Sequence, residues 1–389
     1  MLPKIAAFPL RKLTVNLMQS RTQTYLLGAW LLTAAGCCST RHCEQAGINV
    51  SNYWYQSAAL TRVLEAASIQ TNPVVDMLVL SGGGSHGAWG AGVLRGWREN
   101  TEHPRPKKFQ VVTGVSTGAL LATYAFLGEP ADDDLLQTAY TTVATKDIYR
   151  KKFLLCALFS DSLYKSSPLK KTIAKYISTN TVVRIAEIGR KEHRRLYVGT
   201  VNHDTGKLVI WDLTAIAMDD SNPHRLELYR QVVFASASIP ILVPPVTIDG
   251  NLYADGGARA QLFFEKDFFT TFRHIQSAHE TRPNHPDLVF HIIVNGQLGL
   301  EPQCVPDCLK GIAKSTLAML LDANELGNLY QIEHVRNRIK FGKIWIAPIP
   351  GTLKLTPSDE FIPDKMKELY NAGIEFGKSG NWTNSIPGS

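Results

Sequence analysis

The chain of 389 residues lacks several features that would assign it to a class at once. It has no low-complexity tract and no fixed internal repeat, so disordered and repeat-built proteins find no support. Its six cysteines form no CxxC pair, and no histidine stands at zinc spacing to one of them, which argues against a metal site. Charged residues make up 19% and apolar residues 44% of the chain, as in a globular protein rather than a polytopic membrane protein.

Basic residues are in excess near the N-terminus. The formal net charge is +7, and it falls to +3 without the first 36 residues, which hold four Lys or Arg and no acidic residue. Tyr25–Gly36 is apolar or small throughout, and as a helix it would rise about 18 Å, short of the ~30 Å hydrocarbon core of a bilayer. These features predict a secretory signal peptide over residues 1–36, with Met18 as an alternative start. A buried N-terminal helix is the competing interpretation.

The end of this segment, Ala34-Ala35-Gly36-Cys37, resembles a bacterial lipoprotein signal, in which the cysteine becomes the lipidated first residue. Such signals usually carry Leu where Ala34 stands. The resemblance implies export to the bacterial cell envelope, with a lipid on Cys37 as the membrane anchor. In an exported chain, Cys304 and Cys308 could close a small disulfide loop, and two free thiols are the alternative.

Strand-like and helix-like segments alternate through the rest of the chain. The expected strands are Val74–Leu80, Phe109–Thr113, Leu196–Asn202, Lys207–Leu213, Leu288–Val294 and Phe341–Ile349. The expected helices are Ser85–Glu99, Thr117–Leu127, Arg225–Ala235, Ile312–Ile339 and Asp359–Phe376. No linker divides them. We therefore expect a single three-layer α/β domain with a mostly parallel central sheet flanked by helices.

The first motif is a GxSxG sequence, Gly114-Val115-Ser116-Thr117-Gly118, between an expected strand and an expected helix. A serine hydroxyl is a weak nucleophile unless it is held exposed beside a base, which a sharp strand-to-helix turn can do. The flanking glycines remove the Cβ atoms that would clash in such a turn. Ser116 is therefore a candidate nucleophile, although a simple packing turn has the same composition.

A glycine-rich loop follows the first expected strand, with the sequence Gly82-Gly83-Gly84-Ser85-His86-Gly87. This loop also fits the GxGxxG pattern of dinucleotide-binding proteins. However, the next strand leads into the Ser116 turn instead of ending in the acidic residue that would bind a ribose. Successive glycines before a helix offer bare backbone N–H groups, which bind anions. Beside a nucleophile, the amides of Gly82, Gly83 and Gly84 would form an oxyanion hole.

The third motif, Asp255-Gly256-Gly257, follows the strand-like segment Asn251–Ala254. Taken alone, an aspartate in a glycine turn is commonly only a turn former. In their order along the chain, however, the three motifs resemble the patatin-like phospholipase family of serine acyl hydrolases. Residues 235–240 with Pro244 are similar to the segment that precedes the aspartate of that family.

The resemblance covers about Val74 to Leu300. It implies a patatin-like catalytic domain over residues 73–300, preceded by a leader at 37–72 and completed by the helices and strand of 301–389. One position departs from the family, because His86 stands where Arg or Lys is common. A neutral histidine there would supply less positive field to an oxyanion.

The resemblance also implies a mechanism, a Ser–Asp dyad that needs neither histidine nor cofactor. Asp255 would accept the proton of Ser116 as the serine attacks a carboxylic ester of a phospholipid or another lipid. A carboxylate near its ordinary pKa of ~3.9 is a poor base at neutral pH, and burial would raise that pKa. The dyad therefore requires a buried Asp255.

Two other functions remain open on sequence grounds. An α/β-hydrolase-type esterase would use a Ser–Asp–His triad, and five histidines follow the aspartate, namely His274, His279, His285, His291 and His334. None lies in a glycine-bounded loop. A membrane-anchored lipid-binding protein could keep the fold without turnover.

Residues 146–195 carry 13 Lys and Arg against four acidic residues, a local charge of +9. Aromatic residues are interspersed with this charge. The segment fits a surface that docks on an anionic phospholipid membrane, and the alternative is the solvated face of ordinary helices. No recognition motif for nucleic acid accompanies it.

Overall fold

The computed structural model describes residues 50–69, 74–152, 162–263, 270, 287–299, 304–339 and 342–386. The signal segment, Cys37, and the histidines at 274, 279 and 285 lie outside these ranges. An eight-stranded sheet runs through the described residues in the order β10-β9-β1-β2-β5-β8-β7, with β6 also paired to β5. Its strands are β1 (Val74–Leu80), β2 (Val111–Val115), β5 (Arg195–Asn202), β6 (Lys207–Asp212), β7 (Val246–Ile248), β8 (Asn251–Asp255), β9 (Asp287–Val294) and β10 (Lys343–Pro348).

The sheet is mostly parallel. Strands β10, β9, β1, β2 and β5 run in one direction, while β6 and β8 are antiparallel to β5 and β7 is antiparallel to β8. Since β10 pairs with β9, the C-terminal part of the chain adds the edge strand of this same sheet. The α/β fold class with a mostly parallel central sheet is thereby confirmed.

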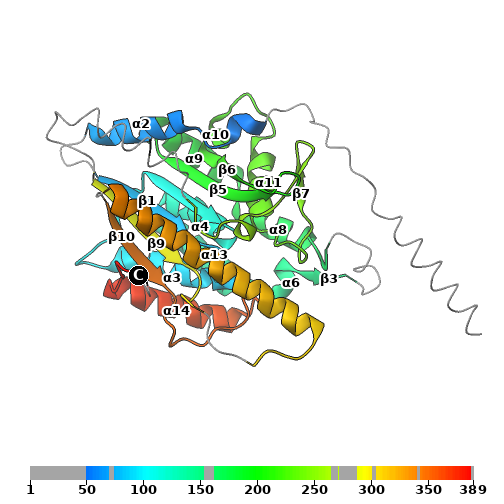
Figure 1. The fold of residues 1–389 in the computed structure, drawn as a ribbon. Coiled ribbons are helices and arrows are strands. Elements are labelled where there is room, and N and C mark those ends of the chain that lie inside the picture. Colours follow the sequence, from blue (N-terminus) through cyan, green and yellow to red (C-terminus); the bar gives the residue numbers. More distant parts are fainter. Residues whose placement is uncertain are drawn as a thin grey trace, which may run out of the picture.

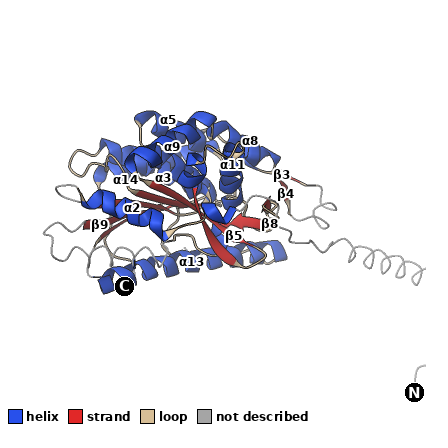
Figure 2. Ribbon diagram, turned by 90° about the horizontal axis from the view of Figure 1, so that it is seen from above, coloured by secondary structure: helices blue, strands red, loops and turns tan. Residues whose placement is uncertain are grey.

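Helices cover both faces of the sheet (Figures 1 and 2). One face packs against α3 (Gly87–Glu99), α4 (Thr117–Leu127), α5 (Pro130–Thr141), α9 (Thr179–Glu192), α10 (Leu213–Met218), α11 (Arg225–Ser236) and α14 (Pro363–Ser379). The other face packs against α2 (Ser57–Ser68) and the long helix α13 (Leu309–Ile339). Within the described residues, no helix is both long and apolar enough to span a membrane.

The apolar strand sequences reflect burial on both faces. Leu78 and Val112 belong to the larger core cluster, whereas Met77 and Val111, one position earlier, belong to the cluster under α2 and α13. Because successive strand residues point to opposite faces, a sheet covered on both sides needs apolar residues at every position. This is why the central strands read as continuous apolar runs.

Two element boundaries differ from expectation in ways that matter for function. The second strand lies at Val111–Val115, two residues later than expected, and so reaches the residue before Ser116. The helix expected from Ser85 begins at Gly87, after a 3₁₀ turn over Gly84–His86. Leu80 at the end of β1 pairs with Gly114 on β2, so the two glycine motifs leave the same edge of the sheet side by side.

Between Pro130 and Glu192 the chain forms α5, α6 (Thr145–Ile148), α8 (Ser167–Tyr176) and α9. It also contains two short antiparallel strands, β3 (Arg150–Lys151) and β4 (Tyr164–Lys165). Cys304 and Cys308, for which a disulfide was one of two expectations, are exposed free thiols.

Candidate active site

Ser116 occupies a sharp turn between β2 and α4. Its backbone has φ 56° and ψ −125°, a conformation that costs a non-glycine residue on the order of 1–3 kcal/mol. The turn needs its flanking glycines, because a Cβ at Gly114 would lie 2.2 Å from the carbonyl oxygen of Gly118. A Cβ at Gly118 would lie 2.5 Å from that of Leu80. The fold therefore presents one serine side chain at the carboxyl end of the sheet.

Two serines of residues 235–240 fix this turn and the aspartate loop together. The Ser236 hydroxyl accepts a hydrogen bond from the Ser116 N–H at 2.9 Å and donates one to the carbonyl of Gly199 at 2.8 Å. The backbone carbonyl of Ser238 accepts the N–H of Asp255 at 2.9 Å. A segment noticed in the sequence without an assigned role thus positions the backbone of both motif residues.

Asp255 lies at the end of β8 and is only 4% exposed. Its carboxylate accepts the backbone N–H of Gly257 at 2.8 Å and lies in the same cleft as the Ser116 hydroxyl. Burial raises the pKa of Asp255 to about 7, although its interactions with Ser116 and with the Gly257 N–H act in the opposite direction. Among the described residues, no Lys, Arg or His forms an ion pair with it. The structure therefore brings Ser116 and Asp255 together, 139 positions apart in the chain.

The glycine loop begins directly after β1 and Ser81. Gly83 has φ 139° and Gly84 has φ 55°, values that favour glycine. Backbone N–H groups of Ser81, Ser85 and His86 have acceptors, whereas the described part of the chain offers none to the amides of Gly82, Gly83 and Gly84. Three adjacent backbone donors are thus left available beside Ser116. In a GxSxG hydrolase such donors stabilise the negative charge that develops on a carbonyl oxygen.

The remaining loop residues hold the loop in place. The N–H of Ser85 donates to the carbonyl of Ser358, and the imidazole Nε2 of His86 lies 2.7 Å from the carbonyl oxygen of Thr356. Burial lowers the pKa of His86, so the ring is neutral at pH 7 and donates to that carbonyl. Gly87 permits close packing on α4, because a Cβ there would lie 2.4 Å from Thr117 Oγ1.

Ser116 stands where two pockets meet. A narrow apolar pocket of about 80 Å³ extends from it between α5, α8 and α11. This pocket is lined by residues such as Leu120, Leu169, Ile173, Val233 and Phe361. An open cleft of about 390 Å³ extends on the other side and is lined by the glycine loop, Asp255 and one side of α13. A substrate with an apolar chain and a bulkier polar part can therefore place its central bond at Ser116.

A family model described as patatin-like phospholipase matches residues 78–265 of the chain. Residues 78–265 are therefore similar to the patatin-like phospholipase family. The match begins within β1 and ends just after the aspartate motif, so it contains the glycine loop, Ser116 and Asp255.

Two curated proteins are similar in sequence. One is a cGAMP-activated phospholipase of Escherichia coli (strain TW11681), 27% identical over 248 residues that make up 61% of this chain and 66% of that protein. The other is the uncharacterized protein R571 of Acanthamoeba polyphaga mimivirus, 26% identical over 182 residues, or 46% of this chain and 57% of that protein. The chain thus spans less than two thirds of the length of each relative.

Two solved structures are similar in outline. VipD from Legionella pneumophila gives a TM-score of 0.40 at 13% identity, covering 82% of this chain and 72% of that one. ExoU from Pseudomonas aeruginosa, solved in complex with SpcU, gives 0.32 at 12% identity, covering 79% and 52%. Both scores are too low to support an argument, so the likeness to the family rests on the match over residues 78–265.

The described histidines after the aspartate line neither of the two pockets at Ser116. His291 is buried, with Nε2 2.8 Å from Asp76 Oδ1 and its ring against Trp97. His334 is exposed on α13. Within the described ranges, no group of three His, Cys, Asp or Glu is placed to hold a metal ion.

Sequence reasoning missed Glu325, in the middle of α13, which lines the open cleft together with the glycine loop. Its side chain is only 9% exposed. Burial raises the pKa of Glu325 to about 7, and the neighbouring Asp322 adds to the rise. The cleft therefore holds a second buried carboxyl group besides Asp255.

Proposed function

We propose that the protein is a serine acyl hydrolase of the phospholipase A or lipid esterase type, which cleaves carboxylic ester bonds of lipids through Ser116 and Asp255. The observation that carries this proposal is that the strained Ser116 and a buried Asp255 line the same cleft, where Asp255 has no cationic partner in the described structure. The patatin-like match over residues 78–265 supports the same class of reaction.

In the proposed reaction, Ser116 Oγ attacks the ester carbonyl carbon while its proton passes to Asp255. The amides of Gly82, Gly83 and Gly84 donate hydrogen bonds to the oxyanion of the tetrahedral intermediate. As the ester C–O bond breaks, Asp255 gives the proton to the leaving alcohol. Water, deprotonated by Asp255, then hydrolyses the acyl-serine and restores the hydroxyl.

A pKa of about 7 suits Asp255 to both halves of this cycle. A group of that pKa exists in both protonation states near neutral pH, so it can accept the serine proton and then return it. The two pockets suggest which part of the substrate binds on each side of Ser116. The acyl chain would enter the apolar pocket, and the alcohol portion with its head group would occupy the open cleft.

A fluorophosphonate probe, followed by hydrolysis of a short-chain ester, tests the proposal. Labelling and turnover are expected in the wild type and lost in Ser116→Ala. A matched control is Ser379→Ala, an exposed serine at the end of α14 that lines neither pocket, in which both are retained. A correctly folded wild type that neither labels nor hydrolyses any ester would favour a lipid-binding protein instead.

The triad alternative has its own test, since three of the histidines lie outside the described residues. His274→Ala, His279→Ala and His285→Ala are expected to keep most of the turnover. Loss of turnover in one of them, with the fold intact, would replace the dyad with a Ser–Asp–His triad.

We further propose that the chain is exported and anchored through a lipid on Cys37, as its N-terminal sequence suggests. Labelled palmitate is expected to be incorporated by the wild type and not by Cys37→Ala when each is expressed in a bacterial host. Equal incorporation in both would contradict the anchor without bearing on the hydrolase proposal.

A further inference from the structure

Exposed apolar side chains surround the mouth of the open cleft. Ile241 is 70% exposed, Leu320 64% and Leu317 36%, and all three line the cleft. Leu163, which is 44% exposed, lies beside them because its N–H donates to the carbonyl of Ile241 at 2.9 Å. Large apolar side chains scattered over a surface need no explanation, but a group at the entrance of a reactive pocket indicates a binding surface.

Ile241 is the most unusual member of this rim. Its φ is +73°, a value that is strongly unfavourable for a β-branched side chain and that glycine adopts without strain. The backbone around it is held by the bond to Leu163 and by a second one from the N–H of Tyr164 to the carbonyl of Leu242. The fold thus keeps this isoleucine in a strained backbone conformation although its side chain is exposed, so burial of the side chain does not offset the strain. This points to a partner that covers the side chain.

The structure also divides the 13 basic residues of the segment 146–195 into distinct groups. Five form ion pairs within the molecule, namely Arg184, Arg190, Lys191, Arg194 and Arg195. Seven others are exposed and form no ion pair within the described residues, namely Lys146, Arg150, Lys151, Lys165, Lys170, Lys171 and Lys175. These seven lie on α6, β3, β4 and α8, where Asp147 is the only acidic residue.

The unpaired charge and the apolar rim occupy the same end of the molecule. Figures 1 and 2 show β3, α8 and the N-terminal end of α13, the helix that carries Leu317 and Leu320, at the same end of the molecule, with α8 and α13 on opposite faces of the sheet. Lys165 lies two residues after Leu163, and Lys151 pairs with Tyr164 across the hairpin. Helix α8 connects this end to the apolar pocket, because its inner residues line that pocket while its lysines face outward.

We propose that this end of the molecule docks on the surface of an anionic phospholipid bilayer, with Ile241, Leu163 and Leu320 entering the interfacial region and the seven basic residues contacting lipid head groups. Below, this docking surface means those ten residues. The proposal rests on the proposed lipid hydrolase function, since docking would bring both pockets at Ser116 against the substrate. The net positive charge favours an anionic membrane over a protein partner. The apolar rim adds side chains that can enter the interfacial region of the bilayer.

Co-sedimentation with vesicles tests the charge, using Ser116→Ala so that no lipid is consumed. The protein is expected to bind phosphatidylcholine vesicles containing 30 mol% phosphatidylglycerol up to about 10⁵-fold more tightly than pure phosphatidylcholine vesicles, at about fivefold for each of the seven basic residues. Removing three charges with Lys151→Gln, Lys165→Gln and Lys171→Gln should weaken binding about 100-fold, at about fivefold for each charge. The matched control is Lys107→Gln with Lys343→Gln. These lysines are exposed at the opposite ends of the parallel strands, and their loss should change binding less than threefold.

A second variant tests the apolar rim independently of folding. Ile241→Gly is expected to weaken binding to the anionic vesicles about tenfold, while its melting temperature equals or exceeds that of the parent because the strain at this position is relieved. The matched control is Ile69→Ser, which removes an isoleucine that is 85% exposed at the end of α2 and should leave binding unchanged.

The outcomes separate this inference from the proposed function. Binding that ignores anionic lipid, or an equal effect of the Lys107 control, overturns the docking surface while hydrolysis of a soluble short-chain ester still supports the hydrolase. Failure to hydrolyse that ester, with vesicle binding intact, overturns the hydrolase and leaves the surface. A concentration-dependent dimer that Ile241→Gly dissociates would assign the rim to a second copy of the chain and overturn membrane docking.

Discussion

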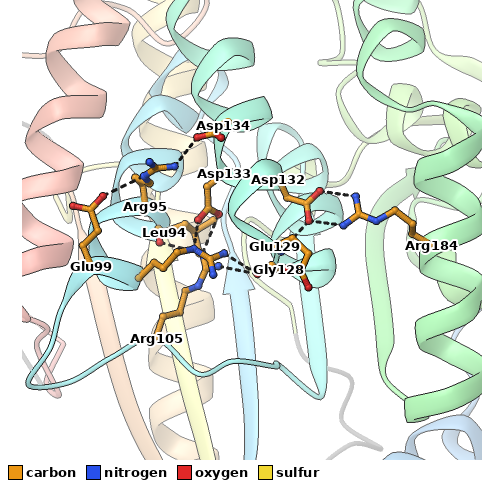
Figure 3. A network of polar contacts seen from close by, with 11 residues as sticks. Leu94, Arg95, Glu99, Arg105, Gly128, Glu129, Asp132, Asp133, Asp134 and Arg184 are labelled. Carbon is orange, nitrogen blue, oxygen red and sulfur yellow. Dashed lines mark hydrogen bonds and ion pairs between the residues drawn. The ribbon is translucent and has the colours of Figure 1, made fainter.

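Buried carboxylates serve two different purposes in this molecule. On α5, Asp132 forms two parallel 2.8 Å hydrogen bonds with Arg184, and Asp133 pairs with Arg98 at 2.5 Å and Arg105 at 3.2 Å (Figure 3). At the carboxyl edge of the sheet, by contrast, Asp255 accepts a hydrogen bond from a backbone amide.

The difference lies in which protonation state the surroundings favour. A guanidinium beside a buried carboxylate offsets the cost of removing its charge from water, so the pair is fixed and structural. Without a cation, burial raises the pKa of Asp255 to about 7, and the group becomes able to exchange a proton at neutral pH. Absence of a counter-charge is therefore what distinguishes a candidate base from a scaffold residue.

The largest expected effect is on turnover. Ser116→Ala and Asp255→Asn should each lower kcat/KM for a short-chain ester by roughly 10⁴-fold, because each removes a member of the proposed dyad. Asp255→Asn should unfold at the same or a higher urea concentration than the wild type, since it replaces a buried carboxyl group that has no cation. A large loss of stability with near-normal kcat would place Asp255 among the structural carboxylates.

The opposite pattern is expected on α5. Asp133→Asn should lower the free energy of unfolding by about 3–5 kcal/mol, because it leaves Arg105, which is 3% exposed, without its counter-charge. The kcat of the folded fraction should stay within about threefold of the wild type, because α5 contributes no proposed catalytic group. Asp134→Asn is the control, since that carboxylate is 64% exposed and its loss should cost below about 1 kcal/mol by urea unfolding.

Stability and turnover are expected to respond to pH in opposite directions. With its pKa raised from 3.8 to about 7, Asp255 keeps a proton in the folded state that the unfolded chain releases above about pH 4. Stability should therefore fall as pH rises toward 7, by at most about 4 kcal/mol for this group, while kcat/KM rises as the base ionises. Urea unfolding at pH 5 and pH 8 should show a weaker decrease in Asp255→Asn, and an equal decrease would refute the assignment.

The smallest expected effect concerns Glu325, the second buried carboxyl group at the cleft. Glu325→Gln replaces this buried carboxyl group with a neutral side chain, so the free energy of unfolding at pH 8 should rise by about 1–3 kcal/mol. At pH 6, where Glu325 itself is largely neutral, kcat/KM should stay within about threefold of the wild type. Glu333→Gln on the same helix, which instead loses an ion pair with Arg336, should not gain stability.

Much of the candidate site could be predicted because its signals are local. The turn at Ser116 requires glycine at 114 and 118, and the loop at Gly82–Gly84 requires residues without side chains. Both features can therefore be recognised in short stretches of sequence. The order of the three motifs then placed Asp255 with them. The fold class followed from the alternation of apolar strands and helices, which local periodicity also records.

The remainder depends on contacts that no local pattern records. Ser236 lies 120 positions from Ser116, and a serine in a helix that ends in small residues gives no sign that it accepts the backbone N–H of Ser116. Glu325 looks like any polar residue of an amphipathic helix, and only the docking of α13 on the sheet buries it. Likewise, a charge count over 146–195 cannot show that Arg184 already has a partner on α5.

The conformation of Ser116 has an implication for related chains. Glycine adopts a φ of 56° with less strain than serine does, so the serine at this position costs the protein stability. A related protein that no longer carries out the proposed reaction could replace this serine with glycine and gain conformational stability. Glycine at this one turn, in an otherwise intact relative, would therefore indicate a protein that has kept the fold and lost the proposed hydrolase activity.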